Sequence, residues 1–378
     1  MKAIKVRIYP DKEQKETIAK TFGCCRFIYN WALAKRIAFY QSTKKMLNKF
    51  VIMSDLTILK RDKNTEWLNE VSAQSLQQAV DDLDSAFSHF FKQNNSFPKF
   101  KSKKNVKQSY RVPQGFEVNR ETHYLRLPKL SWIRFIDEFN VPEGIEFRNI
   151  TVSIEGNRYY ASICYKEPEK QVKQLKVEEK KTVGIDLGVT TLATLSDGTK
   201  IENPHHLKKH EEGIKREQQE LSKKKEGTRA YEKQKARLNE AYREMRDTRK
   251  DFLHKLTTSL VENQNWTSFC VEDLAVKEMI QNNSSPMSKA IGDVGWRMFR
   301  SMMDYKCEDS GKNFIVIGRF EPSSRLCTCG FINHDLTLSD REWDCPVCMA
   351  HHDRDDLAAN NIKRFGLRKE AGQSLLVA

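Results

Sequence analysis

Three acidic residues lie next to apolar segments, where a carboxylate needs a charged partner or a metal ion. Asp186 in VGIDLG and Glu272 in FCVEDL end apolar, strand-like runs, and Asp355 in HHDRDDLAANNI begins a helical pattern. A charge within a buried strand is costly unless it is paired or bound to metal. Two strand-end carboxylates and a third from a helix crossing the sheet suit magnesium, a hard ion that prefers oxygen ligands. The three acids are therefore candidate ligands of a catalytic metal site.

Two magnesium ions about 4 Å apart can activate a water and stabilise the departing oxygen of a phosphodiester. The sequence spacing of the acids is loose and does not identify this class unaided. Each acid alone is also compatible with a strand-end cap or an ion pair, and Asp355 with the favourable charge at a helix start. Asp273, Asp353 and Asp356 are alternative ligands or supporting groups.

Four cysteines form a more specific pattern. Two thiol pairs, each on a predicted turn, have the spacing of a closed, tetrahedral zinc ribbon with a structural role. The ligands are Cys327, Cys329, Cys345 and Cys348. The first pair is CxC, tighter than the usual CxxC, and the alternative is chance clustering of reduced core thiols. For the histidines at 351 and 352 we expect support of the active-site loop or contact with the cleaved strand, rather than zinc ligation.

A basic segment with interleaved aromatic residues follows the first helical region. NNSFPKFKSKKNVKQSYR (94–111) suits a nucleic-acid strand, with phosphates neutralised by cations and bases packed on rings. The candidate contacts are Lys99, Lys101, Lys103, Lys104, Lys107, Tyr110 and Arg111. The alternative is a solvated loop whose aromatic residues anchor it to the core. Gln77 and Gln78 are further candidates because amides pair with adenine edges, although exposed helix positions would look the same.

The chain has 378 residues and a formal net charge of +14, which favours a polyanionic partner. It contains no apolar run near the roughly 20 residues of a membrane helix, and the N-terminal residues do not resemble a signal peptide. Nine cysteines, an odd number, favour reduced thiols. We expect a cytoplasmic protein, nucleoid-associated when bound to DNA, with no membrane partner and no small-molecule substrate.

The N-terminal half predicts strands around a helical insertion. Residues 2–9 alternate as a strand, 15–91 form three or four helices, and 112–166 are strands with a hairpin around Gly156-Asn157. We expect a small β-barrel over 1–13 and 106–170. The helical insertion with the basic loop then covers 14–105, and a polar linker covers 171–181.

The C-terminal half predicts an α/β domain. Residues 182–201 suggest two strands around Asp197-Gly198, and 207–263 suggest two charged antiparallel helices broken near Gly227. A strand at 265–274, a loop at 281–288, a helix at 296–305 and a strand at 313–320 follow. The predicted nuclease domain is 182–318 with 351–378, and the zinc ribbon is 319–350.

Four motifs in order resemble one family. GIDLG at 184–188, VEDL at 271–274, SSRLCTCG…LSDREWDCPVC at 323–348 and HDRDDLAANNI at 352–362 are similar to TnpB proteins of insertion sequences, relatives of type V CRISPR effectors. RIYP with Gly23, Arg26, Tyr29 and Asn30 and the FPKFK…QSYR loop look like the same family. The resemblance covers essentially the whole chain.

The resemblance implies an α/β plus β-barrel architecture. A RuvC (RNase H-like) nuclease domain with a zinc-ribbon insert for target nucleic acid would follow a wedge β-barrel that carries a helical recognition insert. It also implies a guide RNA from the transposon end, double-stranded DNA beside a short flanking motif, and one site that cuts both strands. The magnesium ligands, with manganese as a substitute, fall on Asp186, Glu272 and Asp355. The zinc thiolates fall on the four cysteines named above.

Two positions depart from the family pattern without removing a carboxylate. Leu357 stands where the family often has Asn, and Met349 stands where Gly usually follows the last cysteine. Three other functions are alternatives: an RNA-guided repressor without cleavage, a guide-independent RNase H-fold transposase accessory protein, and a zinc-ribbon transcription factor. The last has no use for the three acids.

Overall fold

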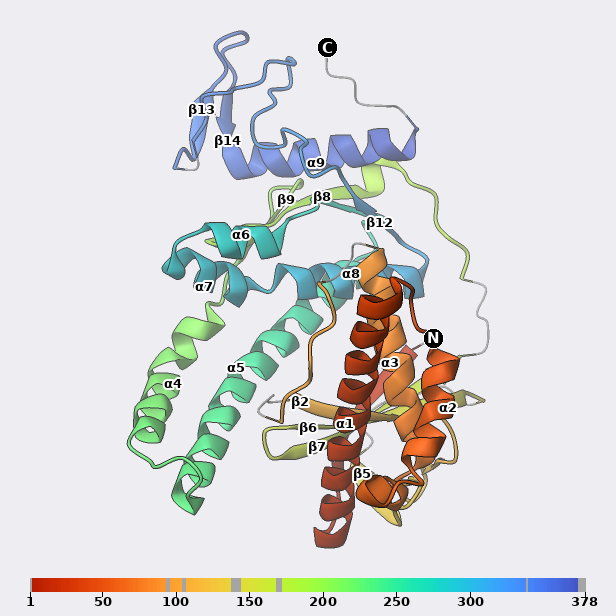
Figure 1. Cartoon of the computed structure of the whole chain (residues 1–378). Coiled ribbons are helices and arrows are strands. Elements are labelled where there is room, and N and C mark those ends of the chain that lie inside the picture. Colours follow the sequence, from red (N-terminus) through yellow and green to blue (C-terminus); the bar gives the residue numbers. More distant parts are fainter. Residues whose placement is uncertain are drawn as a thin grey trace. The chain divides into compact units, whose positions relative to one another are not determined.

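The computed structural model describes residues 2–92, 96–103, 107–136, 144–167, 172–337 and 339–372 (Figure 1). The chain divides into two compact units, residues 1–170 and 171–378. None of the helices within the described ranges is long and apolar enough to cross a membrane.

The sheet of the first unit has seven antiparallel strands in the order β2-β6-β7-β1-β5-β4-β3. The strands are β1 (Lys2–Tyr9), β2 (Lys107–Val112), β3 (Glu117–Asn119), β4 (Tyr124–Arg126), β5 (Trp132–Ile136), β6 (Glu146–Glu155) and β7 (Arg158–Lys166). The predicted first strand and the predicted hairpin are confirmed, with Gly156 at a positive φ of 60° in the turn. Among the described strands no pairing joins the edges β2 and β3, so a closed barrel is not seen.

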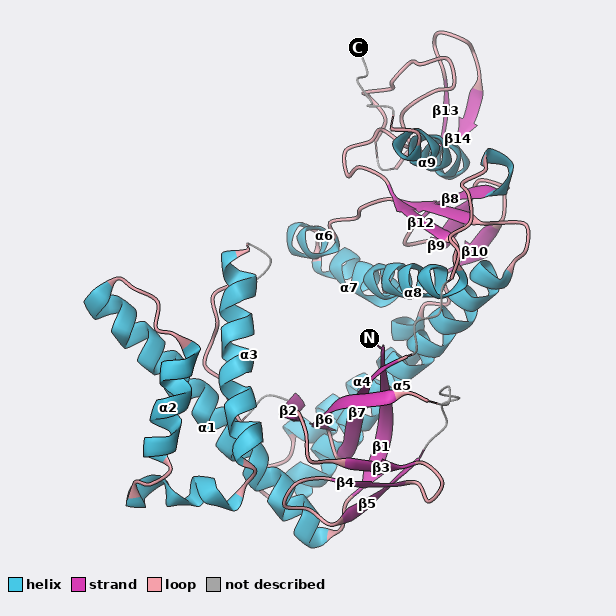
Figure 2. Cartoon of the chain, turned by 90° about the vertical axis from the view of Figure 1, so that its right-hand side faces the viewer, coloured by secondary structure: helices cyan, strands magenta, loops and turns pink. Residues whose placement is uncertain are grey.

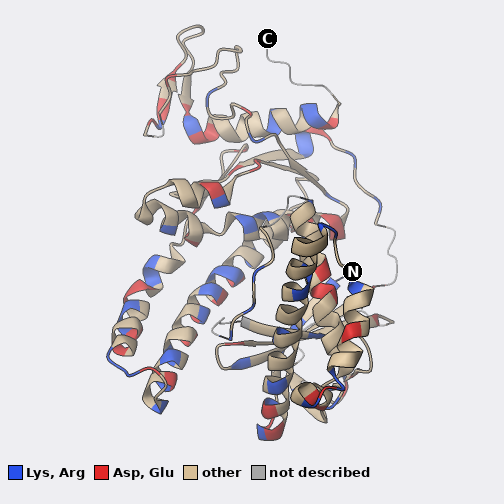
Figure 3. Ribbon diagram, viewed as in Figure 1, with Lys and Arg blue, Asp and Glu red and all other residues tan. Residues whose placement is uncertain are grey.

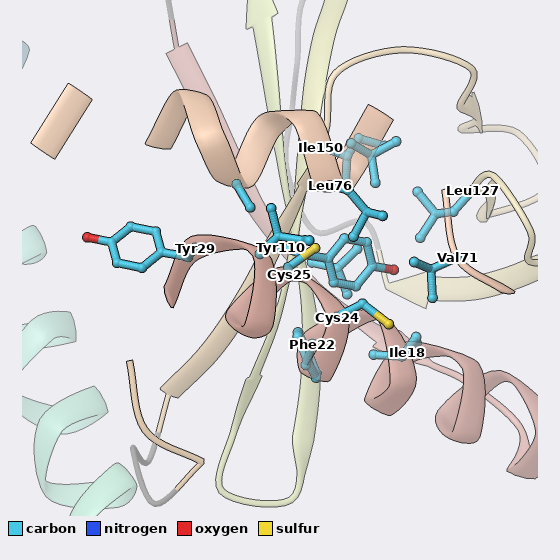
Figure 4. Packing of buried hydrophobic residues seen from close by; sticks show 14 of the residues in the cluster. Ile18, Phe22, Cys24, Cys25, Tyr29, Val71, Leu76, Tyr110, Leu127 and Ile150 are labelled. Carbon is cyan, nitrogen blue, oxygen red and sulfur yellow. The ribbon is translucent and has the colours of Figure 1, made fainter. Parts of the chain in front are cut away.

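Three α-helices and a 3-10 helix confirm the predicted helical region (Figure 2). They are α1 (Lys12–Thr43), α2 (Lys49–Leu59), the 3-10 helix Lys63–Glu70 and α3 (Ala73–Phe91). Asp11 and Gln14 form a reciprocal capping box that begins α1. Buried side chains of α1, α3 and the sheet make one core, in which Phe22 packs edge-on against Tyr110 at 5.5 Å between ring centroids (Figure 4).

The sheet of the second unit has five strands in the order β10-β9-β8-β11-β12. The strands are β8 (Thr182–Asp186), β9 (Thr191–Leu195), β10 (Lys200–Glu202), β11 (Ser268–Val271) and β12 (Asn313–Val316). β8, β11 and β12 run parallel, and β9 and β10 are antiparallel. The predicted turn at Asp197-Gly198 is confirmed between β9 and β10. The predicted number of strands was wrong, because a tight turn closed by Gly188 N and Leu192 O at 3.2 Å separates β8 from β9.

Helices cover both faces of this sheet. The helices are α4 (His206–Ser222), α5 (Arg229–Glu262), α6 (Val276–Asn282), α7 (Ser285–Val294), α8 (Trp296–Ser310) and α9 (Arg354–Glu370). α9 packs on one face and α8 on the other (Figure 1). The predicted charged helical pair is confirmed as α4 and α5. The predicted loop at 281–288 was wrong, since Pro286 lies in the first turn of α7, where its missing N–H costs nothing.

The ribbon between β12 and α9 contains a short antiparallel pair, β13 (Glu342–Asp344) and β14 (His351–Asp353). Its small core joins residues of the ribbon to Leu357 of α9. The ribbon is therefore packed onto the N-terminal end of α9.

Candidate active site

Parallel pairing brings the first two acids together. β8 and β11 run side by side in a register that places Ile185 opposite Val271. Asp186 follows Ile185, and Glu272 follows Val271. Both carboxylates therefore lie at the same end of the parallel strands, at one edge of the sheet. The carboxyl edge of parallel strands is where open α/β sheets place their ligand sites.

The third acid is delivered by a close helix-sheet contact. A Cβ on Gly184 would lie 2.0 Å from the carbonyl oxygen of Ala359 and 2.6 Å from Lys363 N, so α9 touches the backbone of β8. Asp355 lies one helical turn before Ala359. Asp353 caps the helix, with Oδ1 accepting the N–H groups of Asp355 at 2.9 Å and Asp356 at 3.0 Å.

The electrostatics of Asp186 reflect this convergence. Burial, and then the charges of Glu272 and Asp355, raise the pKa of Asp186 to about 8. Burial also raises the pKa of Glu272. Like charges gathered in a poorly solvated place are unfavourable without a cation. The three predicted catalytic residues thus lie close enough to interact, in a setting that favours a bound cation.

The spacing of these ligands differs from that of a single-ion cage. Within the described part of the chain, only the four cysteines bring cysteine, histidine or carboxylate ligand atoms all within 4.8 Å of one another. The three acids are therefore not gathered as closely as the four thiols.

Two residues that the sequence analysis did not single out support Glu272. The Ser323 hydroxyl donates a hydrogen bond to Glu272 Oε1. Asn361, which is buried in α9, donates through Nδ2 to the carbonyl oxygens of Ser323 and Leu326, both at 2.7 Å. Asn361 was detectable as a polar residue on the apolar side of its helix, whereas Ser323 begins the ribbon motif with nothing in its residue type to indicate contact with Glu272.

The three alternative acids have other partners. Arg300 Nη1 contacts Asp273 Oδ1 at 2.5 Å, and Arg319 Nη2 contacts Asp273 Oδ2 at 3.3 Å. Lys200 of β10 pairs with Asp353 at 3.0 Å and with Asp356 at 3.3 Å. These contacts favour supporting roles for all three acids.

The four cysteines are arranged to hold one metal ion. Cys327 Sγ lies 3.5 Å from Cys348 Sγ, and Cys329 Sγ lies 3.6 Å from Cys345 Sγ. Tetrahedral zinc with Zn–S bonds of about 2.3 Å needs sulfurs about 3.8 Å apart. The CxC pair therefore reaches the site despite its short spacing. His352 Nε2 lies 3.1 Å from Cys327 Sγ, where it can donate to a thiolate, and His351 pairs with Asp344.

The two departures from the family pattern have structural counterparts. Leu357 is buried in the ribbon core together with Trp343 and two of the cysteines. Met349 has a φ of 56°, in the left-handed region where glycine is favoured, and its side chain is exposed. The first departure adds apolar packing, and the second places a strained residue after the last cysteine.

Three residues of the N-terminal motif hold the basic loop. Asn30 exchanges two hydrogen bonds with the backbone of Lys101, at 2.7 and 3.0 Å. The Lys101 ammonium lies 3.9 Å from the centre of the Tyr29 ring, and partial burial lowers its pKa. Arg26 donates to Gln108 Oε1 at 3.0 Å. The loop is thus clamped to α1.

The residues predicted to contact nucleic acid have different surroundings in the structure. Lys99 and Lys103 are exposed, whereas Arg111 pairs with Asp82 at 3.4 Å. The prediction for Tyr110 was wrong, because its ring is buried against Phe22 as a core anchor. Lys104 and the side chain of Lys107 lie outside the described residues.

The two glutamines lie on α3. Gln77 is exposed and Gln78 is half-buried. Neither position distinguishes a base contact from an ordinary surface residue, so their role stays a prediction.

Three family models match the chain. One described as "Probable transposase" matches residues 162–283, and one described as "Helix-turn-helix domain" matches 1–45. In this structure the latter range holds β1 and the single helix α1. A third, described as "Cas12f1-like, TNB domain", matches 296–362, a range that includes the ribbon and all four cysteines.

The chain is also similar to whole proteins. A Streptomyces pristinaespiralis protein named "Putative RNA-guided DNA endonuclease" is 35% identical, over 98% of this chain and 90% of that protein. An Escherichia coli K12 protein named "Putative RNA-guided DNA endonuclease InsQ" is 30% identical, over 97% of this chain and 92% of its own.

The fold is also similar to that of solved structures. A chain of the cryo-EM Cas12f1–sgRNA–target DNA complex aligns with a TM-score of 0.58 at 14% identity, covering 93% of this chain and 83% of that one. The full-length relatives and the ordered motifs agree with the resemblance found in the sequence. The chain belongs to the TnpB family of insertion-sequence proteins.

Proposed function

We propose that this protein is an RNA-guided DNA endonuclease whose single RuvC-like site hydrolyses both strands of a DNA target. The observation that carries the proposal is the convergence of Asp186, Glu272 and Asp355 at one sheet edge. There the charges of Glu272 and Asp355 raise the pKa of Asp186. The names of its full-length relatives support the same activity.

We assign Asp186, Glu272 and Asp355 as ligands of two magnesium ions. When bound, the ions would supply an activated water and stabilise the leaving oxygen. Ser323 holds the Glu272 carboxylate in place through its hydroxyl. Asp353 fixes the first turn of α9, so that Asp355 is presented from a capped helix end. The cluster of partly buried acids is the feature of this chain that fits such cations.

The zinc ribbon is assigned a structural role. Four thiolates leave no open coordination position, and a closed site of this kind stabilises a fold rather than catalysing a reaction. Because Leu357 joins the ribbon core to α9, the ribbon also steadies the helix that carries Asp355.

The remaining assignments concern the nucleic acids. We propose that residues 1–13 and 106–170 act as a wedge domain, that 14–105 act as a recognition insert, and that the guide RNA comes from the transposon end. Lys99 and Lys103 would neutralise backbone phosphates without reading sequence, while base pairing with the guide supplies specificity. The structural likeness to a Cas12f1 chain supports a fold of this kind.

The test begins with the RNA. The protein is purified from a host carrying the native locus, the co-purifying RNA is sequenced, and the complex is offered plasmids with a matched target and a randomised flank. We expect one structured RNA species and magnesium-dependent linear plasmid only beside one short flanking motif. Cleavage that ignores the guide sequence would contradict the proposal.

A further inference from the structure

The loop after β12 carries an aromatic side chain that stands almost wholly in water. Phe320 is 93% exposed, more than any other large apolar side chain in the described ranges. Single exposed apolar residues are common and need no explanation by themselves. The surroundings of Phe320 therefore decide whether its exposure has a function.

Phe320 lies on a loop that is fixed at both ends beside the candidate active site. Ile317 N donates to Val271 O at 2.8 Å, which ties the start of the loop to β11. Ser323 is held from two sides, by Glu272 through its hydroxyl and by Asn361 through its carbonyl. Ser323 is three positions after Phe320, so their Cα atoms lie at most about 11 Å apart. The ring is thus presented from a held backbone close to the carboxylates.

Guanidinium groups flank the same place. Arg319 and Arg300 both contact Asp273, the residue after Glu272, and their side chains remain 42% and 40% exposed. Arg319 also lies 3.7 Å from Glu278, and each guanidinium has five N–H donors, so donors remain beyond those that the carboxylates accept. A ring beside such cations suits a nucleotide, because phosphate binds guanidinium and a base stacks on an aromatic face.

We propose that Phe320 stacks on a base of the DNA strand being cut and so holds that strand against the carboxylates. The stacked base lies within a few nucleotides of the cleaved phosphodiester. This inference rests on the proposed function. A single strand is flexible, and fixing one base removes orientational freedom before the reaction. Stacking tolerates any base, as a programmable nuclease requires, since every base has a π-face. Phe320 is a substrate-binding residue in this account.

The test is a double-mutant cycle that combines a substitution of Phe320 with an abasic site in the DNA. Single-turnover cleavage is measured with the full-length protein, its guide RNA and targets that carry one abasic nucleotide at successive positions around the mapped cut. Phe320→Leu should slow cleavage of intact DNA by roughly 5- to 150-fold, the range expected for one lost stack. At one abasic position wild type should slow by the same factor, and Phe320→Leu should slow no further.

Three controls separate stacking from packing. Phe320→Tyr should cut at close to the wild-type rate, and Met287→Ala, which alters an exposed apolar residue of α7, should have no effect. Thermal unfolding of Phe320→Leu should match wild type, because the ring is exposed. A lowered melting temperature would instead assign Phe320 to packing and overturn the proposal.

Two further results would overturn it. The first is a Phe320→Leu protein that cuts intact DNA as fast as wild type. The second is a Phe320→Leu protein whose cleavage rate falls by the same factor as that of wild type at every abasic position. Either result would show that no base stacks on the ring. Failure of wild type to cut intact matched DNA would remove the proposed function as well. The two failures are distinguishable because the wild-type reaction is measured first.

Discussion

At the scale of single residues, burial and neighbouring charge control the protonation of Asp186. The folded protein retains the Asp186 proton up to about pH 8, whereas the unfolded chain loses it near the ordinary value of 3.8. For an acid with a raised folded pKa, folding stability is lost as pH rises through this window. The penalty grows through neutral pH and levels off above about pH 8, and a bound cation would offset it.

This predicts the pH dependence of one substitution. Without added magnesium, Asp186→Asn should melt at a higher temperature than wild type, with a difference that grows from about pH 5 to about pH 8 and then levels off. Magnesium added at the upper end should narrow the difference, because it favours the ionised carboxylate. Thermal unfolding across pH measures both. Parallel curves for the two proteins would mean that Asp186 is not buried among acids.

A second residue-scale prediction concerns Met349. Its φ of 56° is strained for any residue with a Cβ, and its side chain makes little contact because it is 77% exposed. Met349→Gly should therefore stabilise the ribbon by about 1 kcal/mol. Slower zinc release to a chelator would report the change. Met349→Ala is the control, since it removes the side chain and retains the strain, and an equal effect of both variants would contradict the argument.

At the scale of elements, α9 reaches the site because Gly184 has no side chain. Any Cβ there would meet backbone atoms of α9 at distances that real structures do not show. Gly184→Ala should therefore push the helix off β8 and cost about 1–3 kcal/mol or more of folding stability.

Gly213 of α4 provides the matched control. A Cβ at Gly213 would have no neighbour within 4 Å, so Gly213→Ala should stabilise the helix by about 0.5–1 kcal/mol. Urea unfolding compares the two variants. Gly184→Ala should lower the free energy of unfolding, and Gly213→Ala should raise it. An unchanged free energy of unfolding in Gly184→Ala would show that α9 does not contact β8.

The elements also show what could be predicted from the sequence. The strands that lead to Asp186 and Glu272, the helix of Asp355 and the CxC…CxxC ribbon were all predictable, because each depends on local pattern and spacing. The turn at Gly188 was missed because the β-branched residues Val189, Thr190 and Thr191 that follow it favour a strand. α7 was missed because Asn, Ser and Pro favour loops as well as helix starts.

The contacts that complete the site were not predictable. Ser323 meets Glu272, and Asn361 holds Ser323, through tertiary packing of segments distant in sequence. The same limit applies to Tyr110, whose aromatic ring in a basic loop suggested a nucleic-acid contact but which packs in the core. Residue type alone does not distinguish an anchor from a contact.

At the scale of the whole molecule, the net charge of +14 is carried by a surface on which both signs are interspersed, as along α4 and α5 (Figure 3). Binding of a polyanion to such a protein releases counterions, so affinity falls with salt. Lys99→Gln and Lys103→Gln should each reduce the slope of log affinity for the guide RNA against log salt concentration by about 1. Lys99→Arg keeps the charge and should restore the slope.

Filter binding over a range of salt concentrations gives these slopes. Unchanged slopes in both glutamine variants would exclude the basic loop from the RNA interface.

The most direct test of the account compares wild type with Asp186→Asn, Glu272→Gln and Asp355→Asn on end-labelled DNA with a matched guide and magnesium. Because one site serves both strands, wild type should cut both, and each variant should bind the target yet cut neither strand. A variant that retained cutting of one strand, or of both, would contradict the claim that these three carboxylates form the single catalytic centre.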